Sequence, residues 1–230
     1  MLLSGRVAII PGVGGLGGAV ARAFAREGAA VVLGDPSEAA LEYARTAVAV
    51  QWGMVRTVRT DGTATDGERL VQAALDAFDR VDVVVCNADM PSHAAPGVEP
   101  DAWDRTLEAT LFAALALAHA AIPPMRAAGR GAIVFVNSPL LREPAVGHGP
   151  EAAASGALLI AAQVLARELG PSNIRVNTIV PRPDTAAATV AVSTHGEPAG
   201  DPAADAIVFL ASDLAAVVTG QSLDVRTAAV

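Results

Sequence analysis

The chain has 230 residues, of which 52% are hydrophobic and 3% are aromatic, and its formal net charge is −8. This length fits one α/β domain whose core is built mostly from Ala, Val and Leu. The acidic balance argues against nucleic acid or an anionic membrane as a partner, because both would repel the chain.

Three further absences narrow the class of protein. Cys86 is the single cysteine, so an intrachain disulfide is excluded and a reducing compartment is expected. The N-terminus lacks the charged and apolar regions of a signal peptide, and we expect no apolar run of the ~18 residues that a membrane span needs. The sequence therefore predicts a cytoplasmic protein outside the membrane.

Two residue counts limit the chemistry. The chain contains no lysine, since all 16 basic residues are arginines, and its only tyrosine is Tyr43. Any mechanism that needs a lysine is excluded. Tyr43 falls on a predicted outer helix, where we expect it to be a packing residue.

The stretch from residue 7 to residue 35 reads as strand, glycine loop, helix and strand. The loop between strand and helix has the sequence Gly12-Val13-Gly14-Gly15-Leu16-Gly17, which fits G-x-G-x-x-G. Its glycines allow a tight turn and let the backbone approach a pyrophosphate at the helix N-terminus. Asp35 follows about 20 residues later, where a carboxylate accepts ribose hydroxyls and repels a 2′-phosphate. The stretch therefore predicts a dinucleotide site that favours NAD over NADP.

Strands and helices continue to alternate after residue 35. We predict helices over 18–27, over 37 to about 48 and over 66–77, and strands over 54–60 and 81–86. The strand over 81–86 is apolar except for Asp82, which is typical of a strand covered on both faces. This alternation predicts a parallel, doubly wound sheet in a single domain covering residues 1–230.

The chain resembles the short-chain dehydrogenase/reductase family over nearly its whole length. The resemblance rests on the glycine loop and on these later motifs: Cys86-Asn87-Ala88-Asp89, Trp103-Asp104-Arg105, Ile174-Arg175-Val176-Asn177, and Phe209-Leu210-Ala211-Ser212-Asp213 with Thr219-Gly220-Gln221. It implies a Rossmann-type three-layer αβα fold with about seven strands in the order 3-2-1-4-5-6-7. Residues 182–202 would form a short, mobile substrate lid.

The same resemblance implies which residues contact the cofactor. Besides the glycine loop and Asp35, it assigns to NAD binding Asp61, Gly62, Asn87, Ala88 and Thr185. The loop is one residue shorter than the family's pattern, and Pro11 replaces a threonine that would supply an N–H and a hydroxyl. We therefore expect NAD binding to be weakened.

The catalytic positions depart from the family. There, a tyrosine moves the proton, a lysine four residues later lowers its pKa, a serine binds the substrate oxygen, and a helix asparagine supports a proton relay. The serine aligns with Ser138, whereas Ala152 falls on the tyrosine position, Gly156 on the lysine position and Thr110 on the asparagine position. The family's usual proton transfer is therefore expected to be absent.

Other polar residues near Ser138 offer a different chemistry. His148 lies between Ser138 and the following helix, and it could act as a base oriented by Glu143 or Glu151. Asp89 and His93 are expected at the same edge of the sheet. Ser138, His148 and Glu151 are thus the catalytic candidates, and no spacing of His, Cys, Asp and Glu predicts a metal site.

Two long helices, about 100–128 and 151–169, are rich in small residues. In the family these helices pair across a dimer axis, and assemblies that mix an inactive with an active subunit occur. The leading hypothesis is an inactive subunit, in a homo- or hetero-oligomer, that partners an active NAD-dependent alcohol dehydrogenase or ketoreductase paralogue. Two alternatives stay open: a non-redox cyclisation, elimination or isomerisation that uses Ser138 with His148 or Glu151, and a nucleotide-sensing protein without catalysis.

Overall fold

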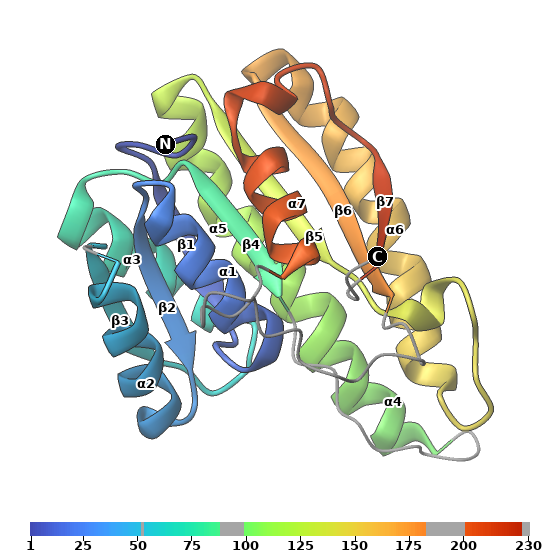
Figure 1. The fold of residues 1–230 in the computed structure, drawn as a ribbon. Coiled ribbons are helices and arrows are strands. Elements are labelled where there is room, and N and C mark those ends of the chain that lie inside the picture. The colour runs from blue at the N-terminus through green and yellow to red at the C-terminus, as the bar shows by residue number, and fades with distance from the viewer. Residues whose placement is uncertain (52, 88–98, 183–200, 227–230) are drawn as a thin grey trace.

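A computed structural model describes residues 1–51, 53–87, 99–182 and 201–226. Within these ranges strands and helices alternate along the chain (Figure 1): β1 (Val7–Pro11), α1 (Gly15–Arg26), β2 (Ala30–Asp35), α2 (Glu38–Ala49), β3 (Val55–Arg59), α3 (Asp66–Phe78), β4 (Val83–Asn87), α4 (Pro100–Leu107), α5 (Ala113–Ala128), β5 (Gly131–Val136), α6 (Gly149–Leu169), β6 (Ile174–Arg182), α7 (Pro202–Ala211) and β7 (Ser222–Arg226).

The sheet confirms the expected topology. All described strand pairs are parallel, and the strand order is β3-β2-β1-β4-β5-β6-β7. The order reverses between β1 and β4, because β1 pairs with both β2 and β4. In open parallel sheets, ligands bind at the carboxyl ends of the strands beside such a reversal. The candidate site is therefore sought at this edge.

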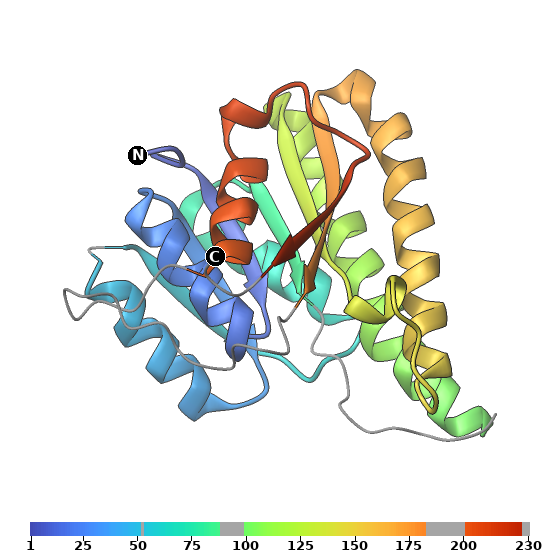
Figure 2. The ribbon, with the colours of Figure 1, turned by 45° about the vertical axis from the view of Figure 1, so that its right-hand side comes forward.

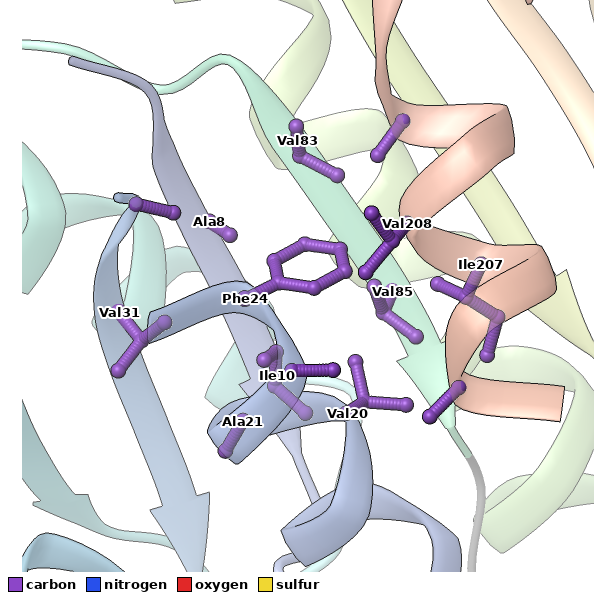
Figure 3. Packing of buried hydrophobic residues seen from close by; sticks show 14 of the residues in the cluster. Ala8, Ile10, Val20, Ala21, Phe24, Val31, Val83, Val85, Ile207 and Val208 are labelled. Carbon is purple, nitrogen blue, oxygen red and sulfur yellow. The ribbon is translucent and has the colours of Figure 1, made fainter. Parts of the chain in front are cut away.

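Helices cover both faces of the sheet, and each face has its own apolar cluster (Figures 1 and 2). On one face α1, α2 and α7 pack over the strands, and the ring of Phe24 lies between Val83 of β4 and Val208 of α7 (Figure 3). On the other face α3, α5 and α6 pack around Phe135 and Met125. Strands buried on both sides explain why β1, β2, β4 and β5 are almost wholly apolar.

Helix α1 begins earlier than predicted. It starts at Gly15 rather than at residue 18, so part of the glycine loop belongs to its first turn. Gly12 and Gly15 have φ angles of 69° and 47°, a conformation that suits glycine and disfavours other residues. Gly28 follows the helix with a φ of 85°, a conformation that favours glycine just past a helix end.

The long helix predicted over about 100–128 is present but not uniform. A single turn of π-helix over Glu108–Phe112 joins α4 to α5. Such turns insert an extra residue into a helix and are frequent at functional sites. Thr110 lies within this turn, and its hydroxyl donates to the Thr106 carbonyl oxygen at 2.6 Å. The hydroxyl is therefore satisfied by the backbone of the preceding turn.

Two apolar stretches correct the expectation that no run is long enough to cross a membrane. Pro100–Ala128 and Gly149–Ser172 reach that length and hydropathy, with mean hydropathies of 1.4 and 1.3. In the 18-residue apolar window of each stretch, 33% of the residues are buried within the protein. Small apolar side chains therefore cover outward faces of α5 and α6 as well as the faces against the sheet.

The expectation for Tyr43 was wrong. This side chain is 74% exposed on α2, whose buried face carries Leu41, Ala44 and Val48 instead. The only phenol of the chain thus lies on an outer surface, away from the edge where the candidate site falls.

Candidate functional site

The glycine loop is fixed by both strands that flank β1. Asn87, at the end of β4, donates its side-chain amide to the Gly12 carbonyl oxygen at 3.1 Å. From the other side, Gly34 of β2 accepts the Gly12 N–H at 2.7 Å. A Cβ atom on Gly17 would lie 1.7 Å from that same Gly12 oxygen, so only glycine fits there. The close approach explains why the spacing of these glycines matters.

The N-terminus of α1 is suited to an anion. Gly14 occupies the N-cap position, no side chain caps the helix, and its first turn contains no acidic residue. Unpaired N–H groups and the positive end of the helix dipole therefore remain available. Gly14, Gly15 and Leu16 are placed where a pyrophosphate would contact the backbone.

Asp35 has a structural task in addition to the predicted one. Its buried carboxylate accepts the Val13 N–H at 3.0 Å and the Ser37 N–H at 2.8 Å. These bonds hold the glycine loop against the start of the segment that leads to α2. Each carboxylate oxygen has a second lone pair, so the ribose role expected for Asp35 is compatible with this geometry.

The loop after β3 is organised by a residue that sequence reasoning missed. One carboxylate oxygen of Asp66 accepts the backbone N–H groups of Asp61, Gly62 and Thr63 at 3.0, 2.8 and 3.2 Å. Its other oxygen accepts from Arg69 at 2.8 Å. The predicted Asp61 instead bonds to Thr63 at the surface, and that hydroxyl lowers the pKa of the Asp61 carboxyl.

A cavity of about 150 Å³ lies between these loops and α5. Of the predicted residues, Gly12, Gly62 and Asn87 line it, together with the buried Asp66. Its remaining walls are mostly apolar and include Ala113 and Leu117. Mostly apolar walls with a few polar groups are typical of pockets that bind small molecules.

Ser138 follows β5 at the same edge of the sheet. Its hydroxyl oxygen accepts the Leu140 N–H at 3.2 Å, and its own N–H donates to the Asn137 side chain at 2.8 Å. The amide of Asn137 in turn donates to the Ser155 carbonyl oxygen of α6 at 2.9 Å. This chain of bonds ties Ser138 to the first turns of α6.

His148 and Glu151 meet at the start of α6. The Nδ1 atom of His148 contacts a carboxylate oxygen of Glu151. Glu151 is buried, with 5% of its surface exposed. Glu143, the other candidate partner of His148, pairs with Arg182 at the surface instead. The structure thus joins two of the three catalytic candidates directly.

The buried face of α6 carries two polar side chains one helical turn apart. Glu151 and Ser155 are both buried, and Ser155 Oγ has no hydrogen-bond partner within the described ranges. Ala152 and Gly156 are more exposed, and a Cβ atom on Gly156 would meet nothing within 4 Å. Ser155 was missed from the sequence, although its spacing of four from Glu151 was available as a signal.

Several predicted residues lie outside the described ranges: Ala88, Asp89, His93, Thr185 and the lid except for its two ends. Among the residues that are described, no group of three or more His, Cys, Asp and Glu side chains is placed to hold a metal ion.

The fold and the glycine loop define a Rossmann-type protein of the dinucleotide-binding class. The family model described as "Enoyl-(Acyl carrier protein) reductase" matches residues 12–226. Taken with the relatives that follow, this match shows that the chain belongs to the short-chain dehydrogenase/reductase family.

Two curated relatives have full-length similarity to the chain. Cis-4-hydroxycyclohexanecarboxylate dehydrogenase of Sinomonas cyclohexanicum is 36% identical over 96% of this chain and 94% of its own. L-rhamnose 1-dehydrogenase (NAD(P)(+)) of Azotobacter vinelandii is 34% identical over 97% and 96%.

Solved structures agree on the fold. A short-chain dehydrogenase/reductase of Burkholderia xenovorans superposes with a TM-score of 0.85 at 30% identity, over 97% of this chain and 95% of the other. Carveol dehydrogenase of Mycobacterium avium in complex with NAD has the same TM-score at 23% identity, over 98% of both chains, which supports the fold alone.

Proposed function

We propose that this chain is a short-chain-dehydrogenase-like subunit that binds NAD weakly and does not itself transfer hydride by the family's proton relay. The observation that carries the proposal is the polar pair on the buried face of α6. Where a tyrosine and a lysine four residues apart would be needed, this face presents Glu151 and Ser155.

The burial of α6 favours a register one residue earlier than the sequence alignment. The tyrosine and lysine of the family must both reach the substrate edge from one helix face. Glu151 and Ser155 share the buried face, and Asn137 joins Ser155 to the loop that carries Ser138. We therefore assign the two positions to Glu151 and Ser155 in place of Ala152 and Gly156. In both registers the phenol and the ammonium are missing.

NAD is the cofactor that the residues fit. The glycine loop and the uncapped start of α1 would hold the pyrophosphate, and Asp35 would accept the ribose hydroxyls. NAD supplies a hydride acceptor when it is bound. Asp35 disfavours the additional phosphate of NADP, because both groups are negative.

An active paralogue is the proposed partner, bound through α5 and α6. Three large apolar side chains are exposed here: Phe112 on the π turn that leads into α5, and Ile160 and Val164 on α6. Small residues between them allow close helix approach. Burying such side chains is worth about 1.5–3 kcal/mol each, which favours an oligomer over a free monomer.

The proposal is tested with the chain purified alone and together with its nearest paralogue from the same host. Native mass spectrometry is expected to show a mixed oligomer, and calorimetry is expected to give tighter binding of NAD than of NADP. The chain alone is expected to turn over no alcohol or ketone. NAD-dependent turnover by the isolated chain would refute the proposal.

A non-redox reaction is the second candidate, favoured by the contact between His148 and the buried Glu151. In such a reaction the pair would remove a proton beside a carbonyl group while the Ser138 hydroxyl donates to the carbonyl oxygen. Nucleotide sensing without catalysis is the remaining alternative.

Proton–deuterium exchange separates the second candidate from the first. The wild type would exchange the α-protons of a carbonyl substrate into D₂O, and Ser138→Ala with His148→Asn would stop the exchange. The control is Glu143→Gln, because Glu143 pairs with Arg182 and does not touch His148. Exchange that survives in the double variant would exclude this candidate.

A further inference from the structure

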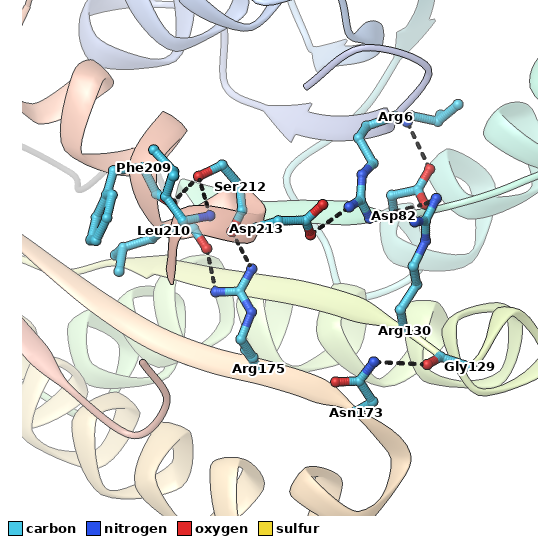
Figure 4. Close-up of polar contacts among 12 residues, drawn as sticks. Arg6, Asp82, Gly129, Arg130, Asn173, Arg175, Phe209, Leu210, Ser212 and Asp213 are labelled. Carbon is cyan, nitrogen blue, oxygen red and sulfur yellow. Dashed lines mark hydrogen bonds and ion pairs between the residues drawn. The ribbon is translucent and has the colours of Figure 1, made fainter. Parts of the chain in front are cut away.

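Four arginines gather at the amino ends of the strands, opposite to the candidate site (Figure 4). Arg6 precedes β1, Arg80 precedes β4, Arg130 precedes β5, and Arg175 is the second residue of β6. The chain as a whole is acidic, so this local excess of positive charge calls for an explanation.

One buried carboxylate, Asp82, faces three of the arginines. It is 1% exposed, and its oxygens accept hydrogen bonds from the Val7 N–H at 2.9 Å and from Arg80 at 2.8 and 2.7 Å. Arg6 and Arg130 reach it only at ion-pair distances of 3.8 and 3.5 Å. Asp82 is therefore hydrogen-bonded mainly by Arg80, and its contacts with Arg6 and Arg130 are longer ion pairs.

The other hydrogen-bond acceptors of these arginines do not balance their positive charge. Asp213 accepts a hydrogen bond from Arg6 at 2.6 Å, but it is 85% exposed. Arg175 donates to the neutral carbonyls of Leu210 and Ser212 at the end of α7. Four guanidinium groups thus face two carboxylates. Burial lowers the pKa of Arg175, Asp213 raises it, and the nearby charge of Arg6 lowers it.

A cavity of about 290 Å³ opens between these groups, far above the ~10–15 Å³ that one water needs. Its lining is mostly polar and includes Arg6, Arg130, Arg175, Asp82, Asp213 and Asn173. The helix dipole explains Arg175, which bonds to the last carbonyls of α7. It does not explain why Arg6 and Arg130 line the same cavity, because neither of them is assigned to the end of α7.

We propose that this arginine cavity binds a small oxyanion of the phosphate class. The planar guanidinium fork matches the oxygen spacing of such an anion, and Arg6, Arg130 and Arg175 approach it from three different elements. The anion would supply the negative charge that the two aspartates leave short. The site is independent of the proposed function, because it lies at the opposite edge of the sheet.

Inorganic phosphate is the probe that tests the proposal. Thermal unfolding is followed with increasing phosphate, at constant ionic strength set with chloride, and calorimetry gives the affinity. A ligand that binds only the folded chain raises its Tm with concentration. We expect phosphate to raise the Tm of the wild type, and we expect Arg130→Gln to weaken phosphate binding at least about tenfold, as the loss of a charged hydrogen bond does.

Two variants keep the test decisive. Arg126→Gln removes the same charge from the exposed last turn of α5, and phosphate binding should be unchanged. Asp213→Asn removes a negative charge from the cavity wall, so it should tighten binding. Equal binding by Arg126→Gln and Arg130→Gln would overturn the proposal, because phosphate would then bind elsewhere, for example at the start of α1. Absence of any Tm shift in the wild type would overturn it as well.

Discussion

Polar side chains have different roles in two parts of the protein: the part around β1 to β4, and the part around β5 and α6. In the first part, Asn87, Asp35 and Asp66 are buried or half-buried, and each accepts from or donates to backbone groups of a loop. These contacts fix the shape of the glycine loop and of the loop after β3, which form the candidate nucleotide site. In the second part, Glu151 and Ser155 lie on the buried face of α6, at the positions that we propose correspond to the family's phenol and ammonium.

The difference teaches that binding and catalysis depend on separate parts of this fold. Loop geometry rests on glycines and on carboxylates bonded to backbone, and it survives when reactive side chains change. The family's proton relay rests instead on the chemical identity of two side chains, because function belongs to the site and not to the fold. A protein of this kind can keep the nucleotide site while its reaction changes or disappears.

The largest expected effect comes from restoring the missing pair. Glu151→Tyr with Ser155→Lys should confer NAD(P)H-dependent reduction on the isolated chain, because general acid–base catalysis contributes about 10²–10⁴-fold. Initial rates of ketone reduction are measured with the purified variant and with the wild type.

Ala152→Tyr with Gly156→Lys is the matched control for the alternative register. We expect no gain of reduction from it. Activity in the control but not in the first double variant would assign the two positions to Ala152 and Gly156. Activity in neither would contradict the assignment of the site.

The glycine loop gives the next largest effect. Gly17→Ala would place a Cβ 1.7 Å from the Gly12 oxygen, so the loop must shift. We expect a loss of about 3 kcal/mol in the free energy of unfolding, as for severe overpacking, and loss of NAD binding. Chemical denaturation and calorimetry measure the two effects.

Gly14→Ala is the control within the same loop. Gly14 has an ordinary φ of −69°, and an added Cβ would meet nothing within 4 Å. Its stability should be close to that of the wild type. Equal losses in both variants would show that the close approach of Gly17 to Gly12 is not what shapes the loop.

Much of the fold could be predicted from the sequence because its signals are local. The glycine spacing before α1 and the apolar run of β4 each report on a few neighbouring residues. The start of α1 was placed three residues late, because a helix that begins inside a glycine loop has no N-cap side chain to mark it.

The site was harder to predict, because its geometry comes from tertiary contacts. Asp66 acts on three N–H groups that only the folded loop brings together, and a helix rich in Ala does not reveal which face is buried. The exposure of Tyr43 was misjudged for the same reason. Glu151 was found through its nearness to His148, whereas Ser155 needed the packing of α6.

Asp66 offers a smaller and more local test of the nucleotide side. In Asp66→Asn the amide keeps one acceptor oxygen but loses the charge that binds three N–H groups and Arg69. We expect a loss of about 1–3 kcal/mol in the free energy of unfolding, the cost of weakened buried hydrogen bonds. Asp61→Asn, at the surface, should cost much less. Equal costs, measured by urea denaturation, would show that Asp66 does not organise the loop.

The smallest expected effect concerns Cys86, which lines the 150 Å³ cavity from the end of β4. Burial raises the pKa of this thiol above its ordinary value of 9.0, so the folded chain keeps the neutral form. Unfolding exposes a thiol that ionises above pH 9. The free energy of unfolding should therefore be unaffected by this group below pH 9 and fall by about 1.4 kcal/mol per pH unit above it.

Urea denaturation at pH 8 to 10 measures this slope of the free energy of unfolding against pH, which should flatten in Cys86→Ala. Equal slopes in the two proteins, or rapid reaction of the native thiol with a disulfide reagent, would mean that solvent reaches Cys86 in the folded chain and that burial does not raise its pKa.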